Sequence, residues 1–297
     1  MDWDHLRVFL AIARENQILA AARRLGLNHA TVARRLDALE EALGAPLFDR
    51  SPGGSNLTQA GEKLLPTVER IESELLGVAD ATRAVGAAIA GTVRIGAPDG
   101  LGNLVLAAEL GGFAVAHPGL RIELVPLPRV FSLSRREADL AITLDPPTEG
   151  RLTVSRLGDY TLGVYAARDY IEKFGAPPTV DALAEHVLVC GVEDYAYASA
   201  LDYTRELEKS AGHIFRCAGV VGQVEAVKAG VGLGVLHDFA VRPEAKLVRL
   251  LPEIGFRRSY YLVSHPETRA LARIAAIHAF LVDLFRARRR FFVRDAV

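Results

Sequence analysis

One long helical pattern, residues 58 to about 88, separates two parts of this chain of 297 residues that differ in their patterns of apolar residues and glycines. Before it, residues 1 to about 60 carry short helical patterns that are broken by glycines. From Thr92 onward, apolar strand-like runs alternate with helix-like runs, which is typical of βαβ units around mostly parallel sheets. A chain of this length exceeds the usual size of one domain. We therefore expect two domains joined by a helix.

The long helical pattern carries a narrow apolar seam. Its members recur at alternating spacings of four and three: Leu64, Val68, Ile71, Leu75, Val78 and Thr82. This spacing is typical of the a and d positions of a helix that packs against a second helix. Thr58 is the expected N-cap, and Pro66 lies near the start of the helix. We expect a two-helix dimer contact, and the alternative is a helix that lies on its own domain.

The segment before the long helix has the layout of a helix-turn-helix. Leu6, Phe9 and neighbouring residues predict a first helix with one apolar face. The next predicted helix, Ile18 to Leu25, is rich in alanine, which allows another helix to cross closely, and it stops at Gly26. Asn28 is then a good N-cap for a further helix. Two helices joined by a glycine-containing turn are typical of this DNA-binding motif.

A local basic patch accompanies this motif. Residues 23 to 36 contain four arginines and no acidic residue, whereas Asp37, Glu40 and Glu41 crowd the far end of the last helix. The N-terminal half of that helix would therefore face phosphates and base edges. The candidate DNA-binding residues in this segment are Arg23, Arg24, Asn28, His29, Thr31, Arg34 and Arg35. The alternative is an ordinary solvated surface.

The composition limits the other possibilities. It is 50% hydrophobic and 24% charged, and 35 basic residues nearly balance 36 acidic ones, which is typical of a globular protein. We find neither a signal-peptide pattern nor an apolar run of membrane-spanning length, and we expect a cytoplasmic protein with no membrane partner. The two cysteines, Cys190 and Cys217, are too few for a disulfide framework or a zinc site. Buried reduced thiols are expected, and a redox-sensing pair is the alternative.

The first sixty residues resemble the LysR-type transcriptional regulators. The matching segments, in order and with the family's spacing, are Ala20–Asn28, Thr31–Leu36, Leu39–Arg50 and Leu57–Gly61. The resemblance implies a winged helix-turn-helix with Asn28 to about Leu43 as recognition helix, the loop Ser51 to Asn56 as wing, and the long helix as dimerisation linker. Two departures are Ala33, where the family often has serine, and a wing without basic residues. Phosphate binding would then depend on Arg34, Arg35 and Arg50.

The remainder of the chain reads as strands and helices that end in polar turns. The alternating residues Val93, Ile95 and Ala97 predict a strand that breaks at Pro98-Asp99-Gly100 before a helix, and such a junction can hold an anion. A later glycine run, Gly230 to Gly234, follows a helix and enters a strand. This order is the reverse of a dinucleotide-binding fingerprint, so we expect no nicotinamide cofactor, and no other cofactor or metal is indicated.

Two further segments resemble the effector-binding half of the same family: Arg136–Ile142 and Val227–Leu236. They imply two Rossmann-like subdomains similar to periplasmic binding proteins, with the chain crossing near Gly158 to Thr161 and returning near Ser264 to Glu267. The predicted fold class is thus α+β multidomain. Its parts are a winged helix-turn-helix (1–60), a linker helix (61–90) and an effector-binding domain (91–297), divided into subdomain I (91–160 and 265–297) and subdomain II (161–264).

A ligand would lie between the two subdomains. By position, the candidate effector-binding residues are Asp99, Gly100, Leu101, Arg129, Thr143, Gly222 and Gln223. Arg129 is the strongest candidate, and its guanidinium would suit a small carboxylate. His237 stands where the family often has proline, and it either lines the rim of the site or caps a turn; we favour the turn.

These features together predict a DNA-binding transcriptional regulator and not an enzyme. The chain has no zinc-ligand histidine spacing, no Gly-x-Ser-x-Gly elbow and no reactive cysteine motif. The expected partners are double-stranded promoter DNA, a small-molecule effector and further copies of the chain in a homodimer or homotetramer, with RNA polymerase as another candidate. The alternative is a solute-binding protein without DNA activity.

Overall fold

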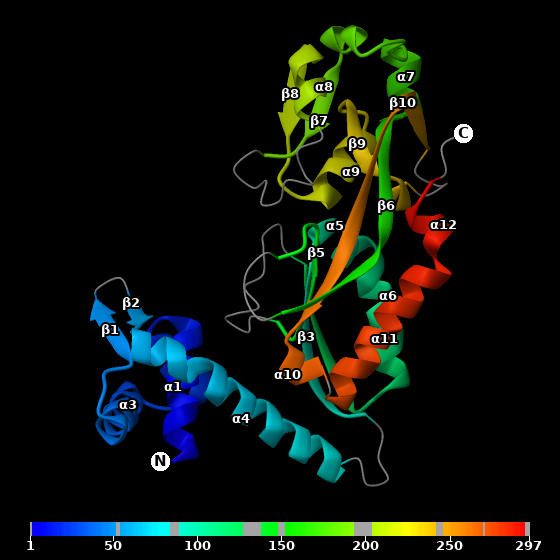
Figure 1. Ribbon diagram of the computed structural model, residues 1–297. Coiled ribbons are helices and arrows are strands. Elements are labelled where there is room, and N and C mark those ends of the chain that lie inside the picture. The colour runs from blue at the N-terminus through cyan, green and yellow to red at the C-terminus, as the bar shows by residue number, and fades with distance from the viewer. Residues whose placement is uncertain are drawn as a thin grey trace. The chain divides into compact units, whose positions relative to one another are not determined.

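The computed structural model describes residues 2–51, 54–83, 89–126, 138–147, 152–192, 204–241, 246–269 and 271–294 (Figure 1). These residues fall into two units, 2–83 and 89–294, and each unit is considered by itself. Among the described residues, no helix has the length and apolar character needed to cross a membrane, and no cluster of three potential metal ligands occurs.

The first unit contains four helices and a hairpin. They are α1 (Trp3–Glu15), α2 (Ile18–Leu25), α3 (His29–Leu43), β1 (Phe48–Ser51), β2 (Gly54–Leu57) and α4 (Gln59–Arg83). Gly26 ends α2 at φ 66°, a left-handed conformation that glycine adopts without steric cost. This is the glycine turn expected between the two helices of the helix-turn-helix, and the prediction is confirmed.

One apolar core holds the first unit together. Phe9 and Ile12 of α1 are fully buried, as are Ala21 of α2 and Leu36 of α3. The small side chain of Ala21 allows α1 and α2 to lie close together, as the alanine-rich sequence indicated. The start of α4 joins the same core through Val68, which is also fully buried. The helices of this unit therefore share a single hydrophobic core.

The hairpin β1–β2 forms the wing, and α1 holds its base. The backbone N–H of Ser55 donates to the carbonyl oxygen of Asn16 at 2.8 Å, at the left-handed C-terminal end of α1. Gly54 has φ 138°, and a Cβ atom there would lie 2.7 Å from the same carbonyl oxygen, so glycine is required. The other end of the hairpin is fixed by Glu40, whose carboxylate accepts from the N–H of Leu47 at 2.7 Å. Both contacts fix the wing relative to α1 and α3.

The apolar seam of α4 divides into two parts. The hydroxyl of Thr58 accepts from the N–H of Gly61 at 3.2 Å, so Thr58 is the N-cap that the sequence predicted. Leu64 and Val68 pack on the core of the first unit, whereas Leu75 and Val78 are 48% and 64% exposed. The early seam thus lies on its own domain and the later seam faces outward. The predicted continuation of the helix through residues 84–88 lies outside the described residues.

The second unit is built on an eight-stranded sheet in the order β4-β3-β5-β10-β6-β9-β7-β8. Its strands are β3 (Gly91–Ala97), β4 (Leu120–Pro126), β5 (Leu140–Thr143), β6 (Thr153–Ala167), β7 (Val187–Cys190), β8 (His213–Arg216), β9 (Leu233–His237) and β10 (Leu247–Ser264). Its helices are α5 (Asp99–Leu101), a π-helical turn (Gly102–Leu106), α6 (Ala107–Ala116), α7 (Arg168–Phe174), α8 (Arg205–Ser210), α9 (Val220–Lys228), α10 (Pro266–Arg269), α11 (Ala272–Ala287) and α12 (Arg289–Phe292). Short 3-10 turns occupy Asp181–Glu185 and Asp238–Ala240.

Two long strands join the halves of this sheet. On one side β3 pairs in parallel with β4 and β5, and on the other side β7 pairs in parallel with β8 and β9. Between them β6 and β10 run antiparallel to each other and pass from one half to the other (Figure 1). The sheet is therefore parallel in each half, as expected, with an antiparallel pair at its centre.

The strand pairings bear on the predicted crossings. In β6, Ser155 pairs with Leu262, while Leu162 and the residues after it pair with β9. In β10, the residues from Tyr261 onward pair with β5. The crossings near Gly158 to Thr161 and near Ser264 to Glu267 stay predictions.

Candidate functional sites

The first candidate site is the exposed face of α3. Asn28 precedes the helix, and its side-chain oxygen accepts from the N–H of Thr31 at 2.7 Å, which makes it the expected N-cap. His29 and Arg34 are exposed on this helix, whereas Val32 is fully buried in the core. The buried face fixes the helix, and the opposite face is open to a partner.

The four arginines of the predicted basic patch differ in their environment. Arg24 pairs with Glu15 at 2.7 Å, and Arg35 pairs with Asp4 at 3.2 Å. Arg23 and Arg34 are exposed and form no ion pair within the described part of the chain. Two cationic side chains of this motif are therefore uncompensated and available to phosphates or base edges.

Two other predicted DNA-binding residues, Thr31 and Arg50, contribute less to the exposed face of α3. Thr31 is half-buried, and its backbone N–H is used by the cap of α3. The backbone of Arg50 lies in β1 of the wing, but its side chain lies outside the described part, as do residues 52 and 53 at the wing tip.

An ion pair that the sequence did not reveal joins α1 to α4. Both terminal nitrogens of Arg14 donate to the carboxylate of Glu72, at 3.1 and 2.6 Å, and the two side chains are only 9% and 20% exposed. Glu72 lies next to the seam, and no spacing rule links it to a residue 58 positions earlier. The pair fixes α4 relative to α1 within the first unit.

The second candidate site lies where the two halves of the second unit meet. Asp99 begins α5 after β3 in one half, and Val220 begins α9 in the other half. The Oδ2 atom of Asp99 accepts from the backbone N–H of Val220 at 2.7 Å. Burial raises the pKa of Asp99, although the hydrogen bond from Val220 favours the charged form. The carboxylate of Asp99 therefore occupies the N-terminus of α9, a position that favours anions.

Glycines bring the two halves together at this point. A Cβ atom on Gly100 would lie 2.9 Å from the side chain of Val220, and one on Gly219 would lie 3.2 Å from the Asp99 carboxylate. Larger residues would push α5 and α9 apart. Asp99 and Gly100 are among the candidates that the sequence indicates, whereas Gly219 and Val220 are not.

The other effector candidates have different surroundings. Gln223 is 8% exposed, and its side-chain nitrogen donates to the carbonyl oxygen of Cys217 at 2.9 Å, while Gly222 packs against the Cys217 sulfur. Both residues lie in the first turn of α9. Leu101 is fully buried in the core, and the Thr143 hydroxyl donates to the carbonyl oxygen of Asp145. Arg129 lies outside the described residues.

His237 occupies the N-cap position of the 3-10 turn Asp238–Ala240, and its side chain is buried. It is the last residue of β9, only 5% exposed, and its ring stacks on Tyr160 with centroids 5.2 Å apart. It precedes the 3-10 turn at Asp238, but its side chain forms no cap hydrogen bond. Burial lowers its pKa to about 4, so the ring is neutral at pH 7. The predicted position at a turn is therefore correct, but the ring packs against Tyr160 and Phe239 and contributes no cap hydrogen bond.

A polar network surrounds the crossing of β6. Asp238 accepts hydrogen bonds from the hydroxyls of Thr161 and Tyr165, and the guanidinium of Arg294 donates to the same tyrosine at 3.2 Å. Burial and the Asp238 carboxylate raise the pKa of Tyr165 to about 12. This network links β6 to the turn after β9 and to the C-terminal segment, and it was not predicted from the sequence.

Comparisons with known proteins match both parts of this chain. The LysR substrate binding domain model matches residues 86–286, and the bacterial regulatory helix-turn-helix model of the lysR family matches residues 3–62. PtxR of Pseudomonas aeruginosa, an HTH-type transcriptional regulator, is 26% identical over 295 residues, which cover 96% of this chain and 92% of that protein. An HTH-type transcriptional regulator of Xanthomonas campestris is 30% identical over 185 residues, 62% of this chain and 54% of that protein, so this match spans about half of that relative.

A solved structure supports the same fold. ArgP from Mycobacterium tuberculosis superposes with a TM-score of 0.66 at 19% sequence identity, covering 97% of both chains. This likeness extends over both units and supports the fold. Because one family model alone matches residues 86–286 and a second matches the DNA-binding segment, this chain belongs to the LysR-type transcriptional regulators.

Proposed function

We propose that this regulator reads promoter DNA with α3 and changes its DNA binding when a small carboxylate enters between the two halves of the second unit. The observation that supports the first part is the cap of Asn28 on α3, with His29 and Arg34 exposed beyond it. A helix held in this way can enter a major groove with its N-terminal residues toward the bases. Arg23 and Arg34, uncompensated within the described part of the chain, would neutralise phosphates or pair with guanine.

The other predicted contacts have secondary roles in this proposal. Arg24 and Arg35 are held by Glu15 and Asp4, so they would shape the surface and exchange partners only when a phosphate approaches. Thr31 and Arg50 would add contacts from the helix and the wing.

The effector proposal rests on the N-terminus of α9. Helix N-termini favour anions, and here the N–H of Val220 already binds the carboxylate of Asp99. A carboxylate effector would compete for this N–H and separate Asp99 from α9. Gly100 and Gly219 would allow its close approach, and Arg129 would supply a second charge contact. The remaining effector-binding candidates would support the residues that contact the effector. They are Leu101, Thr143, Gly222 and Gln223.

The regulator would act as an oligomer in the cytoplasm. Leu75 and Val78 continue the seam of α4 on an exposed face, and a second copy of the helix would cover them. A homodimer, or a homotetramer built from two, would place two copies of α3 in successive major grooves. RNA polymerase is a further candidate partner. The named relatives are regulators, which supports a role in binding over one in catalysis.

A footprinting experiment tests the DNA part of the proposal. The full chain is bound to the DNA upstream of its own coding region and digested with a nuclease. We expect two protected half-sites with centres one helical turn apart, about 10 base pairs, or a multiple of this distance. Even protection along the whole fragment at moderate salt would contradict it.

The effector part is tested by thermal unfolding with a panel of small carboxylates. We expect at least one of them to stabilise the parent, and Val220→Pro, which removes the N–H, to lose this effect. Stabilisation that survives in this variant would place the carboxylate elsewhere.

A further inference from the structure

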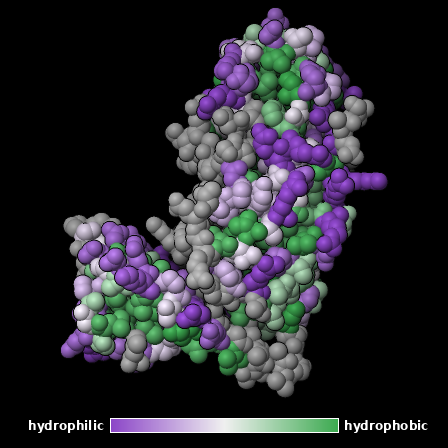
Figure 2. Space-filling view, in the orientation of Figure 1, coloured by the Kyte–Doolittle hydropathy of each residue, from purple (hydrophilic) through white to green (hydrophobic). Residues whose placement is uncertain are grey.

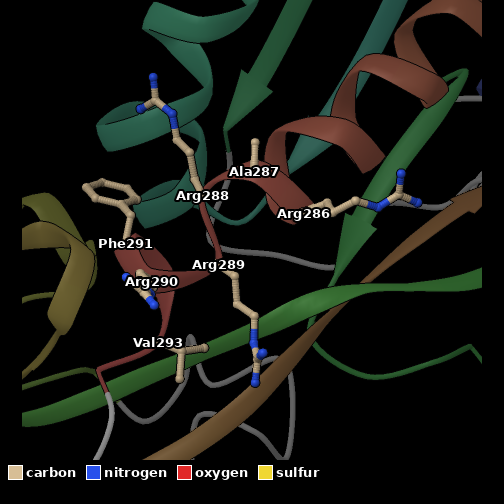
Figure 3. A pocket seen from close by; sticks show the side chains of 7 residues that line it. All are labelled: Arg286, Ala287, Arg288, Arg289, Arg290, Phe291 and Val293. Atoms are coloured by element: carbon tan, nitrogen blue, oxygen red, sulfur yellow. The ribbon is translucent and has the colours of Figure 1, made fainter.

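The turn between α11 and α12 carries an unusual concentration of positive charge. Four arginines, Arg286, Arg288, Arg289 and Arg290, lie within this turn, and we call this set the arginine corner. With Ala287, Phe291 and Val293 they line an open hollow of about 710 Å³ (Figure 3). None of these residues belongs to the DNA-binding or effector-binding candidates above.

Aromatic packing and a backbone hydrogen bond hold the segment that carries the arginine corner. Phe292 is 1% exposed, and its ring stacks on Phe285 of α11 with centroids 4.3 Å apart and parallel planes. The next buried residue is Val293, and the N–H of Arg294 donates to the hydroxyl of Thr161 in β6 at 2.9 Å. The backbone that carries the arginines is therefore fixed at the centre of the second unit.

Only part of the positive charge is compensated. Arg288 pairs with Glu109 at 2.7 Å, and Arg286 approaches Asp283 at 3.4 Å. Arg289 and Arg290 are exposed and form no ion pair with any residue in the described ranges. The corner thus keeps two uncompensated cations on its surface.

The directions of the side chains indicate the shape of the partner. In Figure 3 the side chains of Arg286, Arg288 and Arg289 point away from one another, around the outside of the turn. A small anion would need several donors directed at one point, whereas these donors face outward. The face shown in Figure 2 has hydrophilic residues gathered over the part of the second unit where α12 lies in Figure 1. The partner must therefore present negative charge over an extended surface.

We propose that the arginine corner binds the phosphate backbone of duplex DNA without reading its sequence. Duplex DNA carries one negative charge per about 1.7 Å of its axis, so it can meet outward-facing guanidinium groups from many positions. Phe291, which is 39% exposed, also lines the open hollow beside these guanidinium groups. This contact rests on the proposed function, because binding of α3 to a promoter would raise the local concentration of DNA near the arginine corner. It adds a contact from the second unit to those of α3.

The test compares two double variants of the full chain. Arg289→Ala/Arg290→Ala removes the uncompensated charge of the corner, and Arg121→Ala/Arg168→Ala removes the same charge from two exposed arginines elsewhere in the second unit. The affinity for the protected upstream duplex, extended on both sides, is measured between 50 and 200 mM salt. Each phosphate contact contributes about 0.9 to the slope of log affinity against log salt. We expect the corner variant to lower this slope by about 1 to 2, and the control variant to leave it unchanged.

The selectivity of binding separates this inference from the proposed function. The corner variant should keep the parent's ratio of affinities for the upstream duplex and a scrambled duplex, because phosphate contacts carry no sequence information. A parent without selectivity would contradict the proposed function, whereas a selective parent with an unchanged corner variant would contradict only this inference. An equal slope change in the control variant would also overturn it. Binding to polyglutamate is measured with the same variants. If the corner variant loses this binding but keeps the parent's affinity for DNA, the corner recognises an acidic polypeptide and the inference is wrong.

Discussion

Asp99 accepts a hydrogen bond from the backbone N–H of Val220 at 2.7 Å, so a side chain in one half of the second unit caps a helix in the other half. The bond joins two residues that lie 121 positions apart in the chain. It connects the halves at a point away from the long strands β6 and β10, which are their covalent connection. A ligand that displaces Asp99 from α9 removes a contact between the halves. In the proposed function, an effector changes the position of one half relative to the other in this way.

Asp99→Asn should stabilise the protein at pH 7. Burial raises the pKa of Asp99 above 3.8, so the folded chain binds a proton more tightly than the unfolded chain. This contribution to stability is complete below pH 3.8 and is lost as the pH rises through the folded pKa. The asparagine side chain still offers an oxygen to Val220 but carries no buried charge. Chemical denaturation at several pH values should show a gain at pH 7 that shrinks toward pH 4.

Asp169→Asn is the matched control, because Asp169 is exposed in the first turn of α7. If Asp99→Asn destabilises the protein at pH 7, the hydrogen bond from Val220 to the ionised carboxylate outweighs the cost of burying the charge, and the predicted gain in stability is wrong.

The ion pair between Arg14 and Glu72 should determine the stability of the first unit. Glu72→Gln leaves a guanidinium that is 9% exposed without its carboxylate, and breaking such a pair costs about 2 to 4 kcal/mol, less than for a fully buried pair. Trp3 is the single tryptophan of the chain and lies in α1, so its fluorescence during urea denaturation reports on this unit alone. The exposed Glu74→Gln should change the same transition by less than about 0.5 kcal/mol. Equal effects of the two variants would show that the pair contributes nothing specific.

The exposed part of the α4 seam should control association. Leu75→Glu places a charge where a second helix would bury an apolar side chain, and we expect the dimer dissociation constant to rise at least about tenfold. Leu19→Glu is the matched control, because Leu19 of α2 is exposed to a similar extent, 52% against 48%. Light scattering over a concentration series measures both. A dimer that is unchanged by Leu75→Glu would exclude this face of α4 from the contact.

His237 should make the second unit sensitive to acid. Burial lowers its pKa to about 4, whereas in the unfolded chain it titrates near 6.5. The unfolded chain therefore binds more protons between these values, and the stability present above pH 6.5 falls as the pH approaches 4. The full loss is about 3 kcal/mol.

His237→Phe keeps an aromatic ring beside Tyr160 and should remove most of this dependence. Circular dichroism during denaturation at pH 7 and pH 5 measures it, with the exposed His213→Phe as control. A variant with the parent's pH dependence would assign the acid sensitivity to other groups.

The parts of the structure that the sequence predicted are local. Asn28, Thr58 and Gly26 mark helix ends because caps and left-handed turns depend on residues a few positions away. The seam of α4 predicted a contact with a second helix, with packing on its own domain as the alternative; only the structure shows that Val68 is buried in its own domain and Leu75 is exposed.

The parts that the sequence did not predict depend on distant residues. Glu72 meets Arg14 only after α4 has packed on α1, and Val220 meets Asp99 only after two βαβ units have assembled on either side of β6 and β10. His237 shows the same limit, since its burial follows from the stacking of Tyr160 on a neighbouring strand. The sequence likewise does not show which arginines of the basic patch are paired, because the ion pair of Arg35 depends on where Asp4 lies in the folded unit.

The most direct test of the account is the ratio of affinities for the upstream duplex and a scrambled duplex, measured by gel shift at one moderate salt concentration. For the parent we predict a ratio of about 10³ or more. Arg34→Ala, which removes an uncompensated arginine from α3, should weaken binding to the upstream duplex, whereas the exposed Arg121→Ala in β4 should not. A ratio near one for the parent would contradict the account, and an Arg34→Ala variant that binds as tightly as the parent would remove this arginine from the DNA-reading face.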